Sequence, residues 1–181
     1  MPFYTRRGDD GTTGLLGKGR VPKSDPRIET LGTLDEASAA LGLARASARD
    51  PRCGPLLLQT QRDLYQLMAE VASTAEAAAR FHFKAGRVEW LEQQVEALEP
   101  AVHMPEEFIV PGDSAGGAAL SLARAVVRRA ERRLVEWAGR DPAANPALAQ
   151  YLNRLSSLLF VLELVENQAA GRDTTAARTP E

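Results

Sequence analysis

The sequence predicts an all-α protein, built as an up-and-down bundle of about five helices. Two observations indicate this class. Apolar residues recur every three or four positions through most of the chain after residue 32, which is the spacing of one helix face. Runs that would indicate β-strands are nearly absent. With 181 residues, the chain is long enough for one domain with a sizeable core.

Five helices are expected in order along the chain. The first runs from about Thr33, a potential N-cap with Glu36 at the N3 position, to about Arg49. Prolines and a glycine in residues 50–55 then break the helix. The other four helices are expected at about 55–79, 86–99, 114–139 and 146–170, the fourth capped by Asp113 or Ser114.

Composition and charge narrow the classes of function. Hydrophobic residues make up 44% of the chain and charged residues 25%, which is ordinary for a soluble globular protein. The formal net charge of -2 gives no general attraction for nucleic acid. The lone cysteine, Cys53, excludes an internal disulfide and a thiolate zinc site. We see no signal peptide and no uninterrupted apolar run approaching about 18 residues, so we expect a cytoplasmic protein without membrane spans.

The glycine-rich segment 8–35, GDDGTTGLLGKGRVPKSDPRIETLGTLD, is the most informative part of the sequence. Glycines allow a ligand to approach the backbone closely, and consecutive N–H groups can form a concave anion site. Hydroxyl groups and the side chains of Arg20, Lys23 and Arg27 add donors suited to phosphate oxygens. The segment matches neither a Walker A loop nor a Rossmann turn. Since glycine-rich N-terminal segments are also typical of disordered tails, both interpretations stay open at this point.

A second candidate group is the arginine run RAVVRRAERR, residues 124–133. On a helix, Arg124, Arg128 and Glu131 fall within about 60° of one another, with Arg132 beside them. This face borders the apolar stripe, so its guanidinium groups could aim at phosphates or carboxylates. A solvated basic face with ion pairs three residues apart is the simpler alternative.

Asn153 and Phe108 are weaker candidates. Asn153 lies near a Leu-rich helix face, where it either is buried and needs hydrogen-bond partners or points to solvent. Phe108, in the connector sequence EEFIVPGD, most simply anchors the connector in the core. The two histidines, His82 and His103, form no metal-binding or catalytic pattern.

Taken together, these motifs resemble those of the PduO-type ATP:cob(I)alamin adenosyltransferases. The resemblance extends from Tyr4 to about Asn167 and rests on five motifs in the family's order: GDDGTTGLLGKGRVPKSD, GTLDE, FIVPGD, ARAVVRRAER and YLNRLSSLLF. It implies a ferritin-like, adenosyltransferase-like five-helix bundle that forms a homotrimer with active sites between subunits. It also implies that the enzyme transfers the 5′-deoxyadenosyl group of ATP to the cobalt of cob(I)alamin and releases triphosphate.

The resemblance assigns roles to particular residues. Asp35 would pair with Arg124 across the subunit boundary. Phe108 would lie beneath the corrin ring, exclude the lower axial ligand and favour a four-coordinate cob(II)alamin intermediate that is easier to reduce. The residues implied to bind ATP are Thr5, Arg6, Arg7, Gly8, Thr13, Gly14, Lys23, Arg128, Glu131, Arg132 and Asn153, and those implied to be catalytic are Arg128, Arg124, Asp35 and Phe108. The expected ligands are ATP, Mg²⁺ and cobalamin, with no protein residue assigned to the metal.

The same resemblance gives the domain organisation and the partners. Residues 1–172 would form one adenosyltransferase-like domain, in which residues 1–24 are the ATP-binding loop, and residues 173–181 would be a disordered tail. A reductase would supply the electron and an adenosylcobalamin-dependent mutase would receive the product. We expect neither nucleic acid nor a membrane as a partner.

The chain departs from the family's pattern at several positions. Arg7 occupies the first position of the usual TGD sequence, and Ser38 the last position of D-E-L-N. Ser121 occupies the second position of the L-H pair, and Ser157 the last position of R-L-S-D, where a carboxylate is lost. A second hypothesis is therefore a catalytically weakened carrier or sensor that binds ATP or adenosylcobalamin. A third is a structural bundle whose glycine segment is a loose tail.

Overall fold

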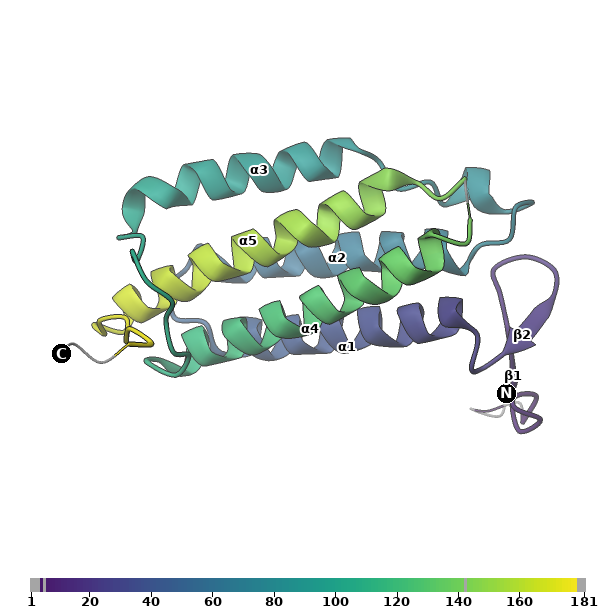
Figure 1. The fold of residues 1–181 in the computed structure, drawn as a ribbon, viewed down its shortest axis with the longest axis horizontal. Coiled ribbons are helices and arrows are strands. Elements are labelled where there is room, and N and C mark those ends of the chain that lie inside the picture. The colour runs from purple at the N-terminus through teal and green to yellow at the C-terminus, as the bar shows by residue number, and fades with distance from the viewer. Residues whose placement is uncertain (1–3, 5, 142, 179–181) are drawn as a thin grey trace.

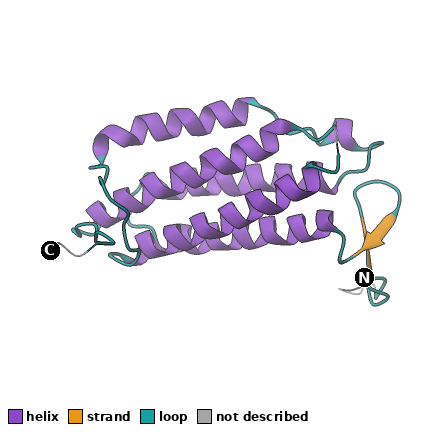
Figure 2. Cartoon of the chain, in the orientation of Figure 1, coloured by secondary structure: helices purple, strands orange, loops and turns teal. Residues whose placement is uncertain are grey.

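The computed structural model describes residues 4, 6–141 and 143–178, and it confirms the predicted all-α bundle (Figure 1). Its five α-helices are α1 (Pro26–Ser47), α2 (Cys53–Ala72), α3 (Gly86–Leu98), α4 (Ala115–Ala138) and α5 (Pro146–Ala169). Short 3₁₀ turns follow two of them, η1 (Ala78–Arg80) after α2 and η2 (Glu99–Ala101) after α3. An antiparallel hairpin of β1 (Thr12–Gly14) and β2 (Arg20–Pro22) precedes α1 (Figure 2).

The helices run lengthwise, and α5 lies between α3 and α4. α1 packs against α2 and α4, α4 packs against α5, and α3 packs on α5 (Figure 1). Leu148, Leu152, Leu155, Leu159 and Leu162 form the predicted inward stripe of α5, and all are at most 2% exposed. By length and composition α5 could cross a bilayer, but 67% of its most apolar window is buried inside the bundle.

The N-terminus of α1 differs from the prediction. The predicted start at Thr33 is wrong, because Asp25 is the N-cap and accepts a hydrogen bond from the N–H of Arg27 at 2.8 Å. Pro26 occupies the first helical position, where its missing N–H costs nothing and its fixed φ suits the helix. Thr33 is instead buried inside the helix, and its hydroxyl donates to the carbonyl of Glu29 at 2.8 Å.

Most of the other helix bounds lie closer to the prediction, but the predicted end of the second helix at about residue 79 is also wrong. α3, α4 and α5 begin and end within one residue of the expected positions. Ser114 is the N-cap of α4, since its hydroxyl accepts a hydrogen bond from the N–H of Gly117 at 2.9 Å. α2 ends at Ala72, earlier than predicted, because Ser73 adopts extended backbone.

Gly116 lets the start of α4 lie close to the end of α5. A Cβ atom at this position would lie 2.6 Å from Oε2 of Glu166. Glu166 is 1% exposed, and its carboxylate accepts hydrogen bonds from the backbone N–H groups of Arg49 and Asp50 at 2.9–3.0 Å. The carboxylate therefore joins the loop between α1 and α2 to the crossing of α4 and α5.

The C-terminal segment lies against the connector that precedes α4, although disorder was expected from residue 173. The Thr175 hydroxyl donates to Oδ1 of Asp113 at 2.6 Å, and the N–H of Ala177 donates to the carbonyl of Phe108 at 2.7 Å. These bonds depend on tertiary placement, which composition does not reveal. The expectation of disorder is thus corrected for the described part of the tail; residues 179–181 lie outside the described residues.

Candidate active site

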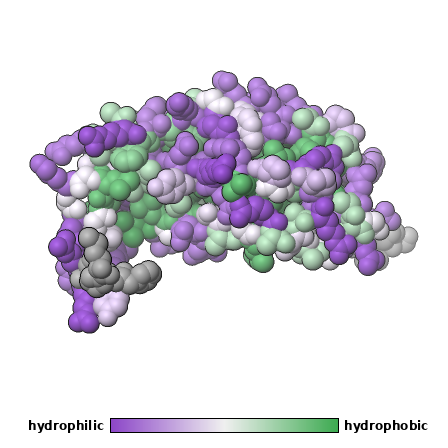
Figure 3. Space-filling view, turned by 180° about the vertical axis from the view of Figure 1, so that it is seen from behind, coloured by the Kyte–Doolittle hydropathy of each residue, from purple (hydrophilic) through white to green (hydrophobic). Residues whose placement is uncertain are grey.

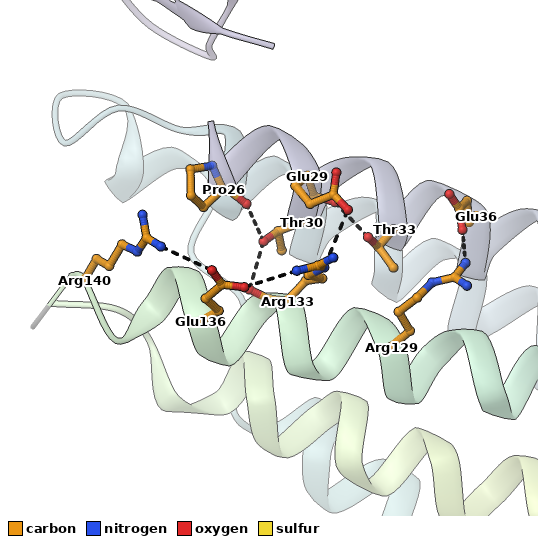
Figure 4. A network of polar contacts seen from close by, with 9 residues as sticks. All are labelled: Pro26, Glu29, Thr30, Thr33, Glu36, Arg129, Arg133, Glu136 and Arg140. Carbon is orange, nitrogen blue, oxygen red and sulfur yellow. Dashed lines mark hydrogen bonds and ion pairs between the residues drawn. The ribbon is translucent and has the colours of Figure 1, made fainter. Parts of the chain in front are cut away.

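Two arginines of the run on α4 face α1 and are paired there (Figure 4). Arg129 forms an ion pair with Glu36, and Nε of Arg133 lies 3.5 Å from Oε1 of Glu29. The hydroxyl of Thr30 also donates to the carbonyl of Arg133 at 3.1 Å. These contacts tie α4 to α1 and neutralise both guanidinium groups. The simpler interpretation of the run expected ion pairs three residues apart, and Arg133 also forms one of these, with Glu136 at 3.3 Å.

The remaining arginines of the run, Arg124, Arg128 and Arg132, lie four residues apart on another face of α4. None of the three forms an ion pair with a carboxylate in the part of the chain that the structure describes. The Arg124 guanidinium lies 5.6 Å from the centroid of the Phe160 ring on α5, and Nη1 of Arg132 donates to the carbonyl of Arg128 at 3.0 Å. This row carries positive charge that no ion pair neutralises within the described residues, so it favours the binding of an anion.

Asn153 and Glu131 join α5 to α4 beside this row. Nδ2 of Asn153 donates to Oε1 of Glu131 at 3.0 Å, and Oδ1 of Asn153 accepts from Nη1 of Arg154 at 2.7 Å. Arg154 in turn donates to Glu92 of α3 at 2.8 Å. The amide is thus half-buried and hydrogen-bonded to its neighbours. Of the two alternatives that the sequence left open, the one in which the amide has hydrogen-bond partners is therefore the better description.

A pocket of about 310 Å³ lies between the ends of these side chains. Its lining includes Arg124, Arg128, Asn153, Ser157 and Phe160. The volume is at the lower end for ligand sites, which suits part of a ligand, such as a chain of phosphates. We call it the arginine pocket.

A second pocket, of about 600 Å³, lies under the connector and shares Arg124 and Phe160 with the arginine pocket. Phe108 lines it and is 90% exposed, so the interpretation of Phe108 as a core anchor is wrong. We call this second site the connector pocket. Because the two pockets share two side chains, they lie next to each other along α4 and α5.

The N-terminal loop is ordered largely by Arg20. Its Nη2 donates to the carbonyl of Arg7 at 2.6 Å, and its Nε donates to Oγ1 of Thr12 at 2.8 Å. Lys23 lies against the loop, since a Cβ atom at Gly8 would be 3.2 Å from its Nζ. Glycine at position 8 therefore leaves room for a lysine ammonium group beside the backbone.

The loop is also docked on the end of α2. The N–H of Leu16 donates to the carbonyl of Ala72, and the N–H of Thr74 donates to the carbonyl of Leu16, each at 2.9 Å. Hydrophobic side chains gather beside the loop on this face, where Leu16 and Tyr65 line a pocket of about 710 Å³ (Figure 3). The described part of the loop is therefore not a loose tail; Thr5 lies outside the described residues.

Within one chain, the predicted ATP residues fall into two separate groups. Arg6, Arg7, Gly8, Thr13, Gly14 and Lys23 lie in or beside the hairpin, next to the N-terminal end of α1 (Figure 1). Arg128, Glu131, Arg132 and Asn153 lie midway along α4 and α5, with Arg128 about 15 Å of helix axis from the C-terminal end of α4. Asp35 is exposed on α1 and forms no ion pair within the described residues.

The structure adds residues to the site that the sequence analysis did not assign to it. Phe160 supports Arg124 and lines both pockets, while Ser121 and Glu163 line the connector pocket. Glu163 had a detectable signal, because it follows Leu159 by four positions on the apolar stripe of α5. A carboxylate at such a position is either paired or functional.

The family model described as cobalamin adenosyltransferase matches residues 3–166. The corrinoid adenosyltransferase PduO of Citrobacter freundii is 37% identical over 183 residues, an alignment that covers 100% of this chain and 54% of that protein. The cobalamin adenosyltransferase of Cupriavidus metallidurans is 41% identical over 168 residues, covering 92% of this chain and 89% of that protein.

A solved structure is similar over nearly the whole fold. It is a variant of the PduO-type ATP:corrinoid adenosyltransferase from Lactobacillus reuteri, complexed with cobalamin and ATP. The TM-score is 0.90 at 28% sequence identity, with 98% of this chain and 100% of that chain covered. The chain spans about half the length of the PduO relatives from Citrobacter freundii and Salmonella typhimurium that it matches.

Proposed function

Because the chain belongs to the cobalamin adenosyltransferase family, we propose that it transfers the 5′-deoxyadenosyl group of ATP to the cobalt of cob(I)alamin. The products are adenosylcobalamin and triphosphate. The observation that carries this proposal is the row of Arg124, Arg128 and Arg132, which forms no ion pair with a carboxylate in the described residues. Arg124 lines two adjoining pockets, and Arg128 lines one of them. One pocket suits phosphates, and the other exposes an aromatic ring to a flat apolar ligand.

The reaction places two demands on the protein. The electron pair of Co(I) forms the bond to C5′ of ATP, and the pair of the C5′–O bond leaves with the triphosphate. The protein must therefore hold C5′ against cobalt and stabilise the negative charge that grows on the leaving group. Arg124 and Arg128 supply donors at the arginine pocket, and Arg132 lies one turn farther along α4. Asn153 with Glu131 positions the nucleotide beside them. The substrate itself is the nucleophile, so a Ser, Cys or His base is not required.

Phe108 is assigned the task of changing the coordination of cobalt. We propose that its ring lies beneath the corrin and excludes the lower axial ligand. A four-coordinate Co(II) without that electron donor is easier to reduce to Co(I). The exposure of the ring and the hydrogen bond from Ala177 to the Phe108 carbonyl support this role, since the backbone is held while the side chain is free to contact a ligand.

We propose that Mg²⁺ enters with ATP. Within the described residues, no group of three or more His, Cys, Asp or Glu could hold a metal ion. Mg²⁺ commonly keeps several waters and binds substrate phosphates with one or two carboxylates. Glu131, the carboxylate within the arginine run, is already hydrogen-bonded to Asn153. Phosphate oxygens and water are therefore the expected ligands.

We further propose a homotrimer with active sites between subunits, in which the N-terminal loop of one subunit meets the arginine pocket of another. The separation of these two groups in one chain supports it. Asp35, exposed on α1, would then reach Arg124 of a neighbour. A cytoplasmic location, a reductase as electron donor and a mutase as recipient of the product follow from family membership and stay predictions.

The test is an anaerobic assay with chemically reduced cob(I)alamin, ATP and Mg²⁺, followed by the loss of the Co(I) absorbance. Formation of adenosylcobalamin and triphosphate in equal amounts, absent without protein, is the expected result. Tight binding of ATP or adenosylcobalamin without turnover would favour a carrier or sensor instead. If the protein shows neither binding nor turnover, the remaining interpretation is a purely structural bundle.

A further inference from the structure

A carboxyl group with an unused oxygen lies at the connector pocket. Glu163, on α5, is 2% exposed, and its Oε1 has no hydrogen-bond partner among the described residues. It lines the pocket with Phe108, Ser121 and Arg124. A buried polar atom without a partner destabilises the folded state, so such an atom calls for an explanation.

The neighbours of Glu163 leave this oxygen free. Burial raises the pKa of its carboxyl, while a hydrogen bond from Ser121 and the charge of Arg124 oppose the rise; the charge of Asp113 adds to it. Arg124 does not close an ion pair with Glu163 in the described structure, since its guanidinium lies over the Phe160 ring. Oε1 of the carboxyl is thus buried at the pocket wall without a hydrogen-bond partner among the described residues.

The carboxyl group of Glu163, with its unpartnered oxygen, is complementary to a primary carboxamide. A carboxyl oxygen accepts from an amide N–H in either protonation state, and a protonated carboxyl also donates to the amide carbonyl. The rest of the pocket includes Ile109, Pro111 and Phe160, which suit the short hydrocarbon arm that carries such an amide. The rim of a corrin ring bears arms of this kind, acetamides and propionamides.

We propose that Glu163, assisted by Ser121, binds one peripheral carboxamide of the corrinoid and thereby selects amidated corrinoids. This inference rests on the proposed function, because it takes the connector pocket as the corrinoid side of the active site. The proposal explains why the bundle buries a carboxyl oxygen of Glu163 without a hydrogen-bond partner among the described residues. A purely structural Glu163 would instead hold helices together, and its removal would destabilise the fold.

The first experiment compares Glu163→Leu and Glu163→Gln with wild type, using Glu96→Gln on exposed α3 as a control for lost charge. We expect Glu163→Leu to raise or keep the melting temperature while raising the KM for cobalamin about tenfold or more, with the KM for ATP unchanged. Glu163→Gln keeps a group that pairs with an amide, so its KM should stay near wild type. A lower melting temperature for Glu163→Leu with an unchanged KM for cobalamin would overturn the proposal.

The second experiment changes the ligand. Partial hydrolysis of cobalamin gives monocarboxylic acids in which one peripheral amide is a carboxylate, and their cob(II) forms can be titrated by calorimetry. One isomer should bind wild type about tenfold more weakly than cobalamin, and Glu163→Gln should narrow this difference because it removes a carboxyl from the site. Equal discrimination by wild type and Glu163→Gln would overturn the inference while turnover by wild type still upheld the proposed function. A wild type that binds no corrinoid would overturn both.

Discussion

Arg128 and Arg129 are adjacent in the sequence, yet they have different surroundings. Successive residues of an α-helix point about 100° apart, so one side chain can face a neighbouring helix while the next faces a pocket. Arg129 is paired with Glu36 of α1 (Figure 4). Arg128 instead lines the arginine pocket without a carboxylate partner in the described residues. The pair therefore offers an internal comparison between an arginine that is paired with α1 and one that we propose binds ATP.

Replacing Arg128 by Ala should strongly impair the use of ATP and leave the fold intact. Removal of one preorganised donor from a developing anion typically costs a factor of about 100 to 1,000 in rate. The side chain is exposed and has no ion pair to lose in the described structure, so the melting temperature should change little. Steady-state kinetics with cob(I)alamin and ATP measure the effect.

The matched control is Arg129→Ala. It removes the same charge one position away, and an exposed ion pair contributes at most about 1 kcal/mol to stability. Its kcat/KM should stay near wild type. Similar losses in both variants would mean that general charge, and not the arginine pocket, controls ATP use.

Replacing Phe108 by Ala should separate corrinoid binding from the change in cobalt coordination. The ring is 90% exposed, so little packing is lost and the fold should be unaffected. The variant should still bind cob(II)alamin but fail to form the four-coordinate species, which low-temperature EPR distinguishes. Val110→Ala is the control, because Val110 is also an exposed apolar residue of the connector. Four-coordinate cob(II)alamin in Phe108→Ala at the wild-type level would contradict the role of the ring.

Among the elements, the crossing of α4 and α5 determines where the site residues meet. Gly116 lies at this crossing, and a methyl group there would lie 2.6 Å from Oε2 of Glu166. The carboxylate cannot move away without losing hydrogen bonds from the N–H groups of Arg49 and Asp50. Gly116→Ala should therefore lower the free energy of unfolding by about 1–3 kcal/mol. For a chain of this size the melting temperature should fall by about 2–4 °C for each kcal/mol, which differential scanning calorimetry detects.

Gly32→Ala is the opposite case and serves as the control. Gly32 lies inside α1, and a Cβ atom there would meet nothing within 4 Å. Alanine favours the helix over glycine by about 1 kcal/mol, so this variant should be more stable than wild type. A stabilised Gly116→Ala would show that the crossing can relax around the added methyl group.

Helices with local signals were predictable, and the segments that depend on distant contacts were not. α4 and α5 have sharp caps and clean apolar stripes, so both lie within one residue of the expected bounds. The true start of α1 also has a local signal, Asp25 followed by Pro26, but it precedes the apolar stripe and was overlooked. The tail is different, because Thr175 is held by Asp113, which lies 62 positions away and leaves no mark in a local pattern.

The candidate site was predictable in composition and only partly in arrangement. The family motifs identify Arg128, Asn153 and Phe108, and the structure places them along adjoining pockets. Periodicity alone does not tell which arginines face α1, since that depends on how α1 and α4 pack. Glu163 was missed because a charge in a Leu-rich helix is most simply taken as its solvent side, and its burial is evident once the bundle closes around α5.

At the scale of the whole molecule, the two groups of residues expected to bind ATP lie apart from each other within a single chain. The loop that carries Gly8 and Lys23 is docked beside the end of α2, where the N–H of Leu16 donates a hydrogen bond to the carbonyl of Ala72. The arginine pocket lies farther along the bundle, between α4 and α5. A closed ring of identical subunits could bring the loop of each subunit to the pocket of the next, because a head-to-tail contact repeats around a cyclic axis.

This arrangement predicts that two inactive variants restore activity when they are mixed. Lys23→Ala damages the loop and Arg128→Ala damages the pocket, so each homo-oligomer should have little activity. In randomly mixed oligomers, about a quarter of the sites would combine an intact loop from one variant with an intact pocket from the other, giving about a quarter of wild-type activity. The variants are mixed in equal amounts under dissociating conditions, reassembled and assayed. Mixing Arg128→Ala with Asn153→Ala, which damage the same pocket, is the control and should restore nothing. If the first mixture is as inactive as the control, each active site is built within a single chain and the shared-site proposal is wrong.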